Sequence, residues 1–393
     1  MMTTATMSLD ELMRSERDGQ VPLYAKRDIA LVRGDGAYLY DTTGRRYLDA
    51  MSNYGVAVLG HADAEFAAAM TEQLATLTTG HQSFGNDVRA LLLAEIAQIS
   101  PKELPRSFLS NSGTEAIEAA LKFARAVTGR PNLVAARRGY HGRTFGALAA
   151  TADPKYRGPF EPLPIPARHV PFNNIEALTA AVNDQTAAII LEPIQGEAGV
   201  YLADDAFLRA AREVATAKGA LLIADEVQTG FRTGAAFATV AAGVIPDLLC
   251  TAKALANGFP IGLTLTSEVV SAALPPGAHG STFGGNPLAC RAALTTLTIL
   301  RERDLYAQSV RVGDAIVRRV AGLESPKVRA VRGRGLMIGI ELKERVTPTL
   351  RALQDLDVLA LPAGNLVLRL LPPLIWKESQ VDELLAALEE VLR

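Results

Sequence analysis

The chain has 393 residues, of which 49% are hydrophobic and 21% charged, and its formal net charge is −2 at pH 7. This length exceeds what one hydrophobic core usually serves, so we expect a large domain with a smaller companion. The near-neutral charge gives no electrostatic footprint for nucleic acid, so we do not expect DNA or RNA as a partner. No apolar run approaches the roughly 20 residues that span a bilayer, so we do not expect a membrane-spanning segment.

The first 58 residues are rich in turn signals, with a hairpin-like stretch, YLYDTTGRRYL, at 38–48. We expect this segment to pack with the C-terminal part of the chain. The start, MMTTATM at 1–7, has no basic stretch followed by an apolar one, which disfavours a secretion signal. A cytoplasmic protein is the simplest expectation.

Residues 59–290 alternate short apolar runs with amphipathic helical stretches, which is typical of an α/β domain whose mostly parallel sheet is covered by helices. Helices are expected at 113–128 and 205–218. The expected strands are 107–110, 132–136, 187–192, 220–225, 247–251 and 262–266. Ligands bind at the carboxyl ends of strands in open α/β sheets, and Ser110, Glu192, Asp225 and Lys253 stand at or just beyond such ends.

The character of the chain changes after this region. Long helices are expected at 287–304 and 305–322, strands at 335–342 and 366–370, and a final amphipathic helix that carries Val381, Leu384, Leu385, Leu388 and Val391. We interpret 291–393 as a smaller α+β domain. Because 1–58 is expected to pack with it, this domain is built from both termini.

Lys253 follows an apolar run at 248–250, and Asp225 with Glu226 closes the strand expected at 220–225. Apolar surroundings lower the pKa of a lysine and make its amine a nucleophile, while a buried carboxylate keeps a pyridinium nitrogen protonated. The pair suggests pyridoxal phosphate chemistry. A solvated lysine and a capping or salt-bridging aspartate are the alternatives.

The segment SNSGTEA at 110–116 lies between an expected strand and an expected helix. The hydroxyls and backbone N–H groups of Ser112, Gly113 and Thr114 are therefore candidates for binding a phosphate at the helix N-terminus. An ordinary cap at Ser112 or Thr114 is the alternative. The loop GSTFGGNP at 280–287 offers further hydroxyls for such a site, or is a simple turn.

Two arginines are candidates for binding carboxylates. In YHGRT at 140–144, Tyr140 can stack on a flat ring and Arg143 can clamp a carboxylate, although a core tyrosine and a surface arginine would fit the same letters. Arg369 is the one charge in LVLRLLPP at 366–373 and needs a counter-charge, which is either a bound carboxylate or a structural salt bridge.

Cysteine and histidine usage argues against two further kinds of site. Cys250 and Cys290 cannot form a disulfide framework, and the five histidines show no metal-ligand spacing. We expect a reducing compartment and no metal.

These segments, in this order, resemble the class III pyridoxal-phosphate aminotransferases of the acetylornithine/ornithine aminotransferase family. The match runs from about residue 22 to the C-terminus. Its most specific pieces are SNSGTEA at 110–116, YHGRT at 140–144, EPIQGE at 192–197, DEVQTG at 225–230 and the segment around Lys253. The resemblance implies fold type I, pyridoxal 5'-phosphate as the cofactor, and a homodimer with shared active sites.

The resemblance also implies roles for individual residues. Lys253 would hold the cofactor as a Schiff base and move the proton, and Asp225 would pair with the ring nitrogen. Glu197 would pair with Arg369 and screen it when a terminal amine reacts, so that one site serves both an ω-amino donor and glutamate. At the cofactor ring, the resemblance implies that Val227 packs opposite Tyr140 and that Gln228 lies near the ring hydroxyl. At the phosphate, it implies Gly113 and Thr114 together with Thr282 of the other subunit, while Ser112 and Glu226 belong to the same cofactor-binding segments. Around substrate carboxylates, it implies Arg143, Arg369 and Ser281. The family usually has phenylalanine where Tyr140 stands, which leaves stacking intact.

Within the family, SPKVRAVRGRGLM at 325–337 and RLLPP at 369–373 look most similar to aminotransferases of lysine biosynthesis through α-aminoadipate. Those enzymes act on a semialdehyde attached to the small acidic carrier protein LysW. A basic cluster is therefore either a docking surface for such a carrier or a solvated face. The cluster comprises Lys327, Arg329, Arg332, Arg334, Lys343 and Arg345.

The expected function is an ω-aminotransferase that moves an amino group between glutamate/2-oxoglutarate and a blocked amino-acid semialdehyde. The first expected substrate is [LysW]-aminoadipate semialdehyde, and the alternative is an N-acetylornithine aminotransferase of arginine biosynthesis, or an enzyme with both functions. An aminomutase or decarboxylase on the same cofactor and a nonenzymatic ligand-binding protein are more distant rivals. A nicotinamide-dependent dehydrogenase falls away because no GxGxxG follows an expected strand.

Overall fold

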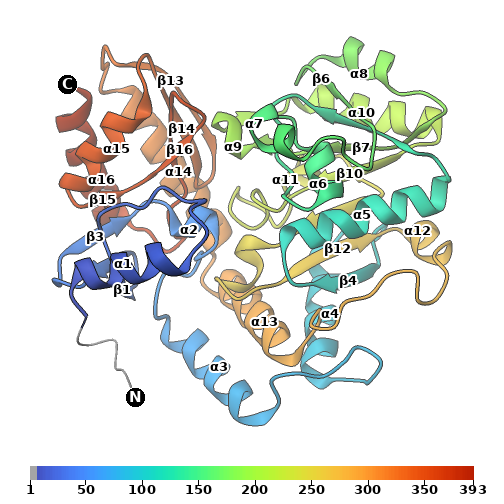
Figure 1. The fold of residues 1–393 in the computed structure, drawn as a ribbon, viewed down its shortest axis with the longest axis horizontal. Helices are drawn as coiled ribbons and strands as arrows, with labels where there is room; N and C mark the ends of the chain where they lie inside the picture. Colours follow the sequence, from blue (N-terminus) through green and yellow to red (C-terminus); the bar gives the residue numbers. More distant parts are fainter. Residues whose placement is uncertain (1–6) are drawn as a thin grey trace.

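The computed structural model describes residues 7–393. The expectation that the segment 1–7 is not a secretion signal therefore falls almost entirely outside the described residues. A seven-stranded sheet with the order β4-β12-β11-β10-β7-β5-β6 forms the centre of the larger part (Figure 1). Only β12 runs antiparallel to its neighbours, which confirms the expected α/β fold with a mostly parallel sheet. The strands are β4 (Arg106–Ser110), β5 (Asn132–Ala136), β6 (Ala167–Val170), β7 (Thr186–Leu191), β10 (Leu221–Asp225), β11 (Leu248–Thr251) and β12 (Gly262–Thr266).

Helices cover both faces of this sheet. Successive side chains of a strand point to opposite faces. On one face, Leu133 and Ala135 of β5 pack into a core with α5 (Gly113–Thr128). On the other face, Val134 and Ala136 pack with α10 (Asp205–Lys218). Both helices have the bounds that the sequence predicts.

The edge strand β6 was not expected from the sequence. Its four residues, ARHV, include two polar side chains, and only Val170 is fully buried. A short strand at a sheet edge needs few apolar residues, so it leaves little periodic signal.

The chain termini meet in a second sheet with the order β1-β2-β3-β15. Its members are β1 (Leu31–Asp35), β2 (Tyr38–Asp41), β3 (Arg46–Asp49) and β15 (Val358–Leu359). The parallel pairing of β3 with β15 joins residues more than 300 positions apart in the chain. In Figure 1 the blue N-terminal and red C-terminal segments accordingly lie side by side.

A third, antiparallel sheet has the order β13-β14-β17-β16. It lies between the helices α14 (Leu305–Ala321) and α16 (Glu378–Leu392) on one side and the larger part of the molecule on the other. It contains β13 (Val328–Arg334), β14 (Met337–Leu342), β17 (Val367–Leu370) and β16 (Leu361–Ala363). Ile338 and Ile340 on one face pack into the core with α14 and α16. Gly339, on the other face, lies against Gly199 and Val200 of the larger part.

Shorter elements connect these layers. They are α1 (Leu9–Gly19), α2 (Ser52–Gly55), α3 (Ala64–Thr76), α4 (Asp87–Ile99), α6 (Phe145–Ala150), α7 (Pro154–Arg157), the 3₁₀ helices η2 (Gly158–Phe160) and η3 (Lys253–Ala256), α8 (Ile175–Ala181), β8 (Ile194–Gln195), α9 (Gly196–Gly199), β9 (Tyr201–Leu202), α11 (Ala238–Ala241), α12 (Glu268–Ala272), α13 (Pro287–Glu302) and α15 (Val346–Asp355). Among residues 7–393, no helix is both long and apolar enough to cross a bilayer.

Candidate active site

A cavity of about 410 Å³ lies at the carboxyl edge of the central sheet. Its size is within the range of small-molecule sites. Its walls come from segments within 53–56, 111–114, 140–143, 192–197, 225–228 and 252–261. Residues far apart in sequence thus converge where an open α/β sheet binds ligands.

Lys253 enters this cavity from the first position of η3, directly after β11. Burial lowers the pKa of its amine and the charge of Arg369 adds to this effect, while Glu197 and Asp225 act in the opposite direction. No carboxylate among residues 7–393 lies within 4.0 Å of its Nζ. The amine is therefore held in the cavity without a fixed ion pair, and its lowered pKa favours the neutral, nucleophilic form.

Asp225 closes β10 and is almost fully buried. Its Oδ1 accepts a hydrogen bond from the backbone N–H of Val227 at 3.0 Å, and its Oδ2 lies 2.7 Å from Nδ1 of His141. A carboxylate offers about four acceptor positions, so Asp225 has capacity for another donor.

His141 is buried beside Asp225, and its Nε2 has no hydrogen-bond partner among the described residues. Burial lowers the pKa of His141, but the hydrogen bond and charge of Asp225, together with the charge of Glu192, outweigh it and raise that pKa. Glu192, at the end of β7, accepts a hydrogen bond from the backbone N–H of Tyr140 at 2.9 Å. Burial raises the pKa of Glu192 to about 8.

The N-terminus of α5 faces the same cavity. The hydroxyl of Ser112 caps the helix by accepting from the N–H of Glu115, so the capping alternative is correct for this side chain. The next two backbone N–H groups, of Gly113 and Thr114, find no acceptor within residues 7–393. A Cβ at Gly113 would lie 2.6 Å from Val227 Cγ1, so only glycine fits there. Two free donors at a helix N-terminus form an anion site.

Tyr140 and Arg143 form one aromatic and cationic wall with Tyr156. The Nε of Arg143 donates to the hydroxyl of Tyr140 at 3.0 Å, and its guanidinium lies 3.9 Å from the centre of the Tyr156 ring. The two tyrosine rings meet edge to face at 5.6 Å. Arg143 thus has a fixed position, while its other donors remain open to the cavity.

Behind the lysine lies a buried network around Arg369. Its Nη1 donates to Glu197 Oε1 at 2.7 Å and to Gln228 Oε1 at 3.2 Å, while Nε and Nη2 have no partner in the described part of the chain. Gln228 also donates to Glu197 at 3.3 Å. Burial opposes ionisation of Glu197, but the charges of Arg369 and Lys253 prevail and lower its pKa.

Four of the residues expected at the site do not line the cavity. Arg369 lies behind Glu197, and Ser281 contacts the cavity residue Asn111 at 3.0 Å. Thr282 is exposed on its loop. Glu226 is fully buried on the far side of the turn, where its carboxylate accepts from Thr229 Oγ1 and from the N–H of Thr239. These oxygens hold the turn, so Glu226 is not available for the cofactor contact that we expected from the sequence.

Sequence reasoning missed two residues with a place in the site. It named His141 only within its motif and as one of five scattered histidines, and it gave Glu192 no role beyond a polar strand end. The signal for both was the clustering of polar residues at the ends of expected strands. The contacts of His141 with Asp225 and of Glu192 with the backbone of Tyr140 depend on the sheet order, which the sequence does not reveal.

The comparisons with known proteins agree with this geometry. The family model for class-III aminotransferases matches residues 23–392. A [LysW]-aminoadipate semialdehyde transaminase of Deinococcus radiodurans is 44% identical over 100% of this chain and 92% of that protein. An acetylornithine aminotransferase of Methanopyrus kandleri is 42% identical over 94% of this chain and 96% of that protein. The crystal structure of an ornithine aminotransferase from Toxoplasma gondii superposes with a TM-score of 0.94 at 29% identity, covering 98% and 95% of the two chains.

Proposed function

The chain belongs to the class-III aminotransferases, and from this premise we propose that it moves an amino group between glutamate/2-oxoglutarate and [LysW]-aminoadipate semialdehyde. It is a pyridoxal-phosphate-dependent transaminase. The proposal on the substrate draws on the names of relatives that are 41–44% identical over at least 92% of this chain. The architecture of the site supports it.

The residues of the cavity fit the cofactor. The free N–H groups of Gly113 and Thr114 suit its phosphate, and the unused acceptor capacity of Asp225 suits a protonated ring nitrogen. Tyr140 and Val227 would supply apolar faces for the ring, and Gln228, which also lines the cavity, would be the residue near the ring hydroxyl. When bound, pyridoxal phosphate supplies an electron sink that acidifies the α-proton of an amino acid.

Lys253 then acts as the acid and base. With the cofactor bound, the Lys253 amine would accept the α-proton of the amino acid and give it back, because burial lowers its pKa and favours the neutral form. His141 is a positioning residue, since it orients the Asp225 carboxylate and stabilises its negative charge. Thr282, with Ser281 nearby, would complete the phosphate and substrate sites across a homodimer interface.

The observation that carries the function is the contact between Arg369 and Glu197 beside Lys253. With the pair closed, the guanidinium is neutralised and the cavity can admit an uncharged terminal aminomethyl group. If Glu197 swings away, Arg369 offers a fork of donors to the carboxylate of glutamate. One cavity would thereby serve both half-reactions.

A half-reaction tests the substrate. The cofactor-loaded protein is mixed separately with carrier-linked lysine and with N-acetylornithine, and the change in cofactor absorbance is followed. We expect kcat/KM to be about tenfold higher for the carrier-linked donor. Equal or faster reaction with N-acetylornithine would identify an acetylornithine or dual-function enzyme, which the 42% identity to an acetylornithine aminotransferase keeps as the second candidate.

Other reactions on the same cofactor differ in a simple requirement. A transaminase needs 2-oxoglutarate to regenerate its starting form, whereas an aminomutase or a decarboxylase does not. A nonenzymatic ligand-binding protein would show no turnover with either donor.

Arg143→Ala should raise the KM for the donor about 10- to 100-fold with little change in cofactor affinity, because hydrogen bonds to a charged group contribute about 1.5–3 kcal/mol. Steady-state kinetics and a cofactor titration measure the two effects separately. Arg209→Ala, an exposed arginine on α10, is the control and should leave both unchanged. Equal loss of cofactor and substrate affinity would argue against a carboxylate role for Arg143.

A further inference from the structure

A second concave region of about 880 Å³ adjoins the catalytic cavity. The two share Tyr140 and Glu197 as walls, so the groove lies directly beside the cavity that contains Lys253. Its sides come from segments within 137–140 and 152–156 of the larger part and 362–365 of the antiparallel sheet. The catalytic cavity alone has the size of a small-molecule site, so this groove provides room for something longer.

Three exposed cations line the groove: Arg137, Arg138 and Lys155. None has a carboxylate within 4.0 Å among residues 7–393. The groove also contains two carboxylates: Glu197 is paired with Arg369, and Asp153, the cap of α7, leaves one negative charge against the three positive ones. The balance of unpaired charge in the groove is therefore positive.

Arg138 is held in an unusual way. Its φ of 68° lies in the left-handed region, which is uncommon for residues other than glycine and marks positions held by function or packing. Its guanidinium lies 4.7 Å from the centre of the Tyr201 ring, and Arg332 lies over the same ring at 4.1 Å. This stacking fixes the direction of the Arg138 side chain without neutralising it.

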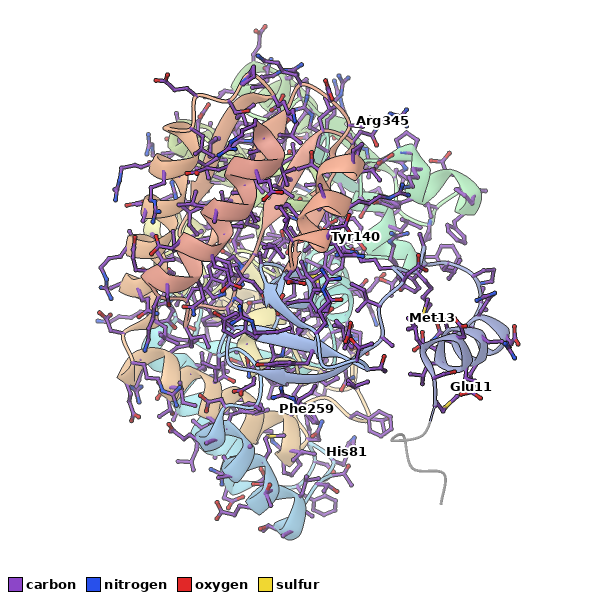
Figure 2. All side chains as sticks on the ribbon, turned by 90° about the vertical axis from the view of Figure 1, so that its left-hand side faces the viewer. Glu11, Met13, His81, Tyr140, Phe259 and Arg345 are labelled. Atoms are coloured by element: carbon purple, nitrogen blue, oxygen red, sulfur yellow. The ribbon has the colours of Figure 1, made fainter. Side chains whose placement is uncertain are left out.

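The basic cluster expected from the sequence is less available. Arg329 and Arg332 both pair with Glu341, and Lys327 Nζ donates to the carbonyl of Val391. Arg345 is exposed, but Figure 2 shows it well separated from Tyr140, above it in that view. Free positive charge that adjoins the catalytic cavity is therefore found at Arg137, Arg138 and Lys155.

We propose that this groove binds an acidic polypeptide segment of the carrier protein that presents the substrate, and that the attached amino acid reaches Lys253 past Tyr140 and Glu197, the two residues that the groove and the cavity share. The inference rests on the proposed function and adds the place of docking. Carboxylates of the segment meet Arg137, Arg138 and Lys155 at the solvent-exposed rim. Charges at a rim act mainly on the association rate and on its dependence on salt.

The test compares two triple variants of the full-length, cofactor-loaded enzyme. R137Q/R138Q/K155Q removes the groove charges, and K327Q/K343Q/R345Q removes the same number of charges from the sequence-predicted cluster. We expect the groove variant to lower kcat/KM for carrier-linked lysine about tenfold, with kcat unchanged and a weaker dependence on salt. The cluster variant should stay within about twofold, as should both variants with N-acetylornithine.

Each outcome separates the two proposals. If the unmodified enzyme does not react with carrier-linked lysine, the proposed substrate is wrong and the docking inference fails with it. If that reaction proceeds and the groove variant matches the unmodified enzyme, or if the cluster variant shows the larger loss, only the docking site is wrong.

An inhibition experiment distinguishes the loss of carrier binding from a folding defect in the groove variant. The carrier without its amino acid should inhibit the reaction of the unmodified enzyme with N-acetylornithine competitively. It should inhibit the groove variant about tenfold more weakly. Equal inhibition of both proteins would overturn the docking site.

Discussion

Lys253→Ala should lower kcat by about 10²- to 10⁴-fold, the usual contribution of a positioned general acid or base. The substitution removes the one amine in the cavity whose pKa is lowered by burial. The N–H groups at the start of α5 and the Asp225 carboxylate remain, so the cofactor should stay bound without a covalent link. Single-turnover kinetics give the rate, and the cofactor absorbance after gel filtration gives its retention.

Lys102→Ala is the matched control, because Lys102 is exposed and lies outside the cavity. Its kcat should be unchanged. A Lys253→Ala protein with the turnover of the unmodified enzyme would contradict the assignment of Lys253. Loss of the cofactor together with activity would show that the covalent link, and not the remaining contacts, holds it.

Much of the fold followed from local patterns. The helices at 113–128 and 205–218 have their predicted bounds because an amphipathic period and a glycine at the C-cap, Gly129 or Gly219, mark both. Six strands of the central sheet were expected within about two residues because each carries its apolar residues in a short run or in alternation. The order of the strands did not follow, since it depends on contacts between segments that are distant in the chain.

The candidate site also combines features that local patterns predict with features that they do not. The candidate residues at strand ends and at the cap of α5 could be predicted from the sequence because their local context is distinctive. The pairing of His141 with Asp225 joins β10 to the loop after β5, and no local pattern encodes it. Glu226 shows the converse error, because adjacent residues in a turn point in different directions and only one of them faces the cavity.

The docking surface illustrates why charge runs in a sequence are weak evidence. The run at 327–345 looks basic, but the antiparallel pairing of β13 with β14 brings Glu341 beside Arg329 and Arg332. The cations at 137–138 and 155 are few and separated in sequence, and the fold assembles them in one groove. The net charge of a surface should therefore be counted after its ion pairs are left out, because an ion pair cancels most of the electric field that a binding partner would meet.

Asp225→Asn should lower kcat by about 10²- to 10³-fold, the usual loss when one group that stabilises charge in the transition state is removed. The amide keeps the size of the side chain and one acceptor, so the turn at Val227 should survive. The raised pKa of His141 depends on the charge of Asp225, so its imidazolium should lose its proton at lower pH in the variant. The rate and the pH at which His141 titrates, followed by NMR, measure the two effects.

Glu226→Gln is the decisive comparison, because it neutralises the adjacent buried carboxylate with the same change of atoms. Burial raises the pKa of Glu226, and its oxygens bond to Thr229 and to the N–H of Thr239 rather than face the cavity. A neutral amide should thus be tolerated, with kcat within about threefold and at most about 1–3 kcal/mol lost in stability. If Glu226→Gln instead reduced kcat as much as Asp225→Asn, that result would contradict the assignment of Asp225 as the only carboxylate at the ring nitrogen, although the turn holds the Glu226 oxygens away from the cavity.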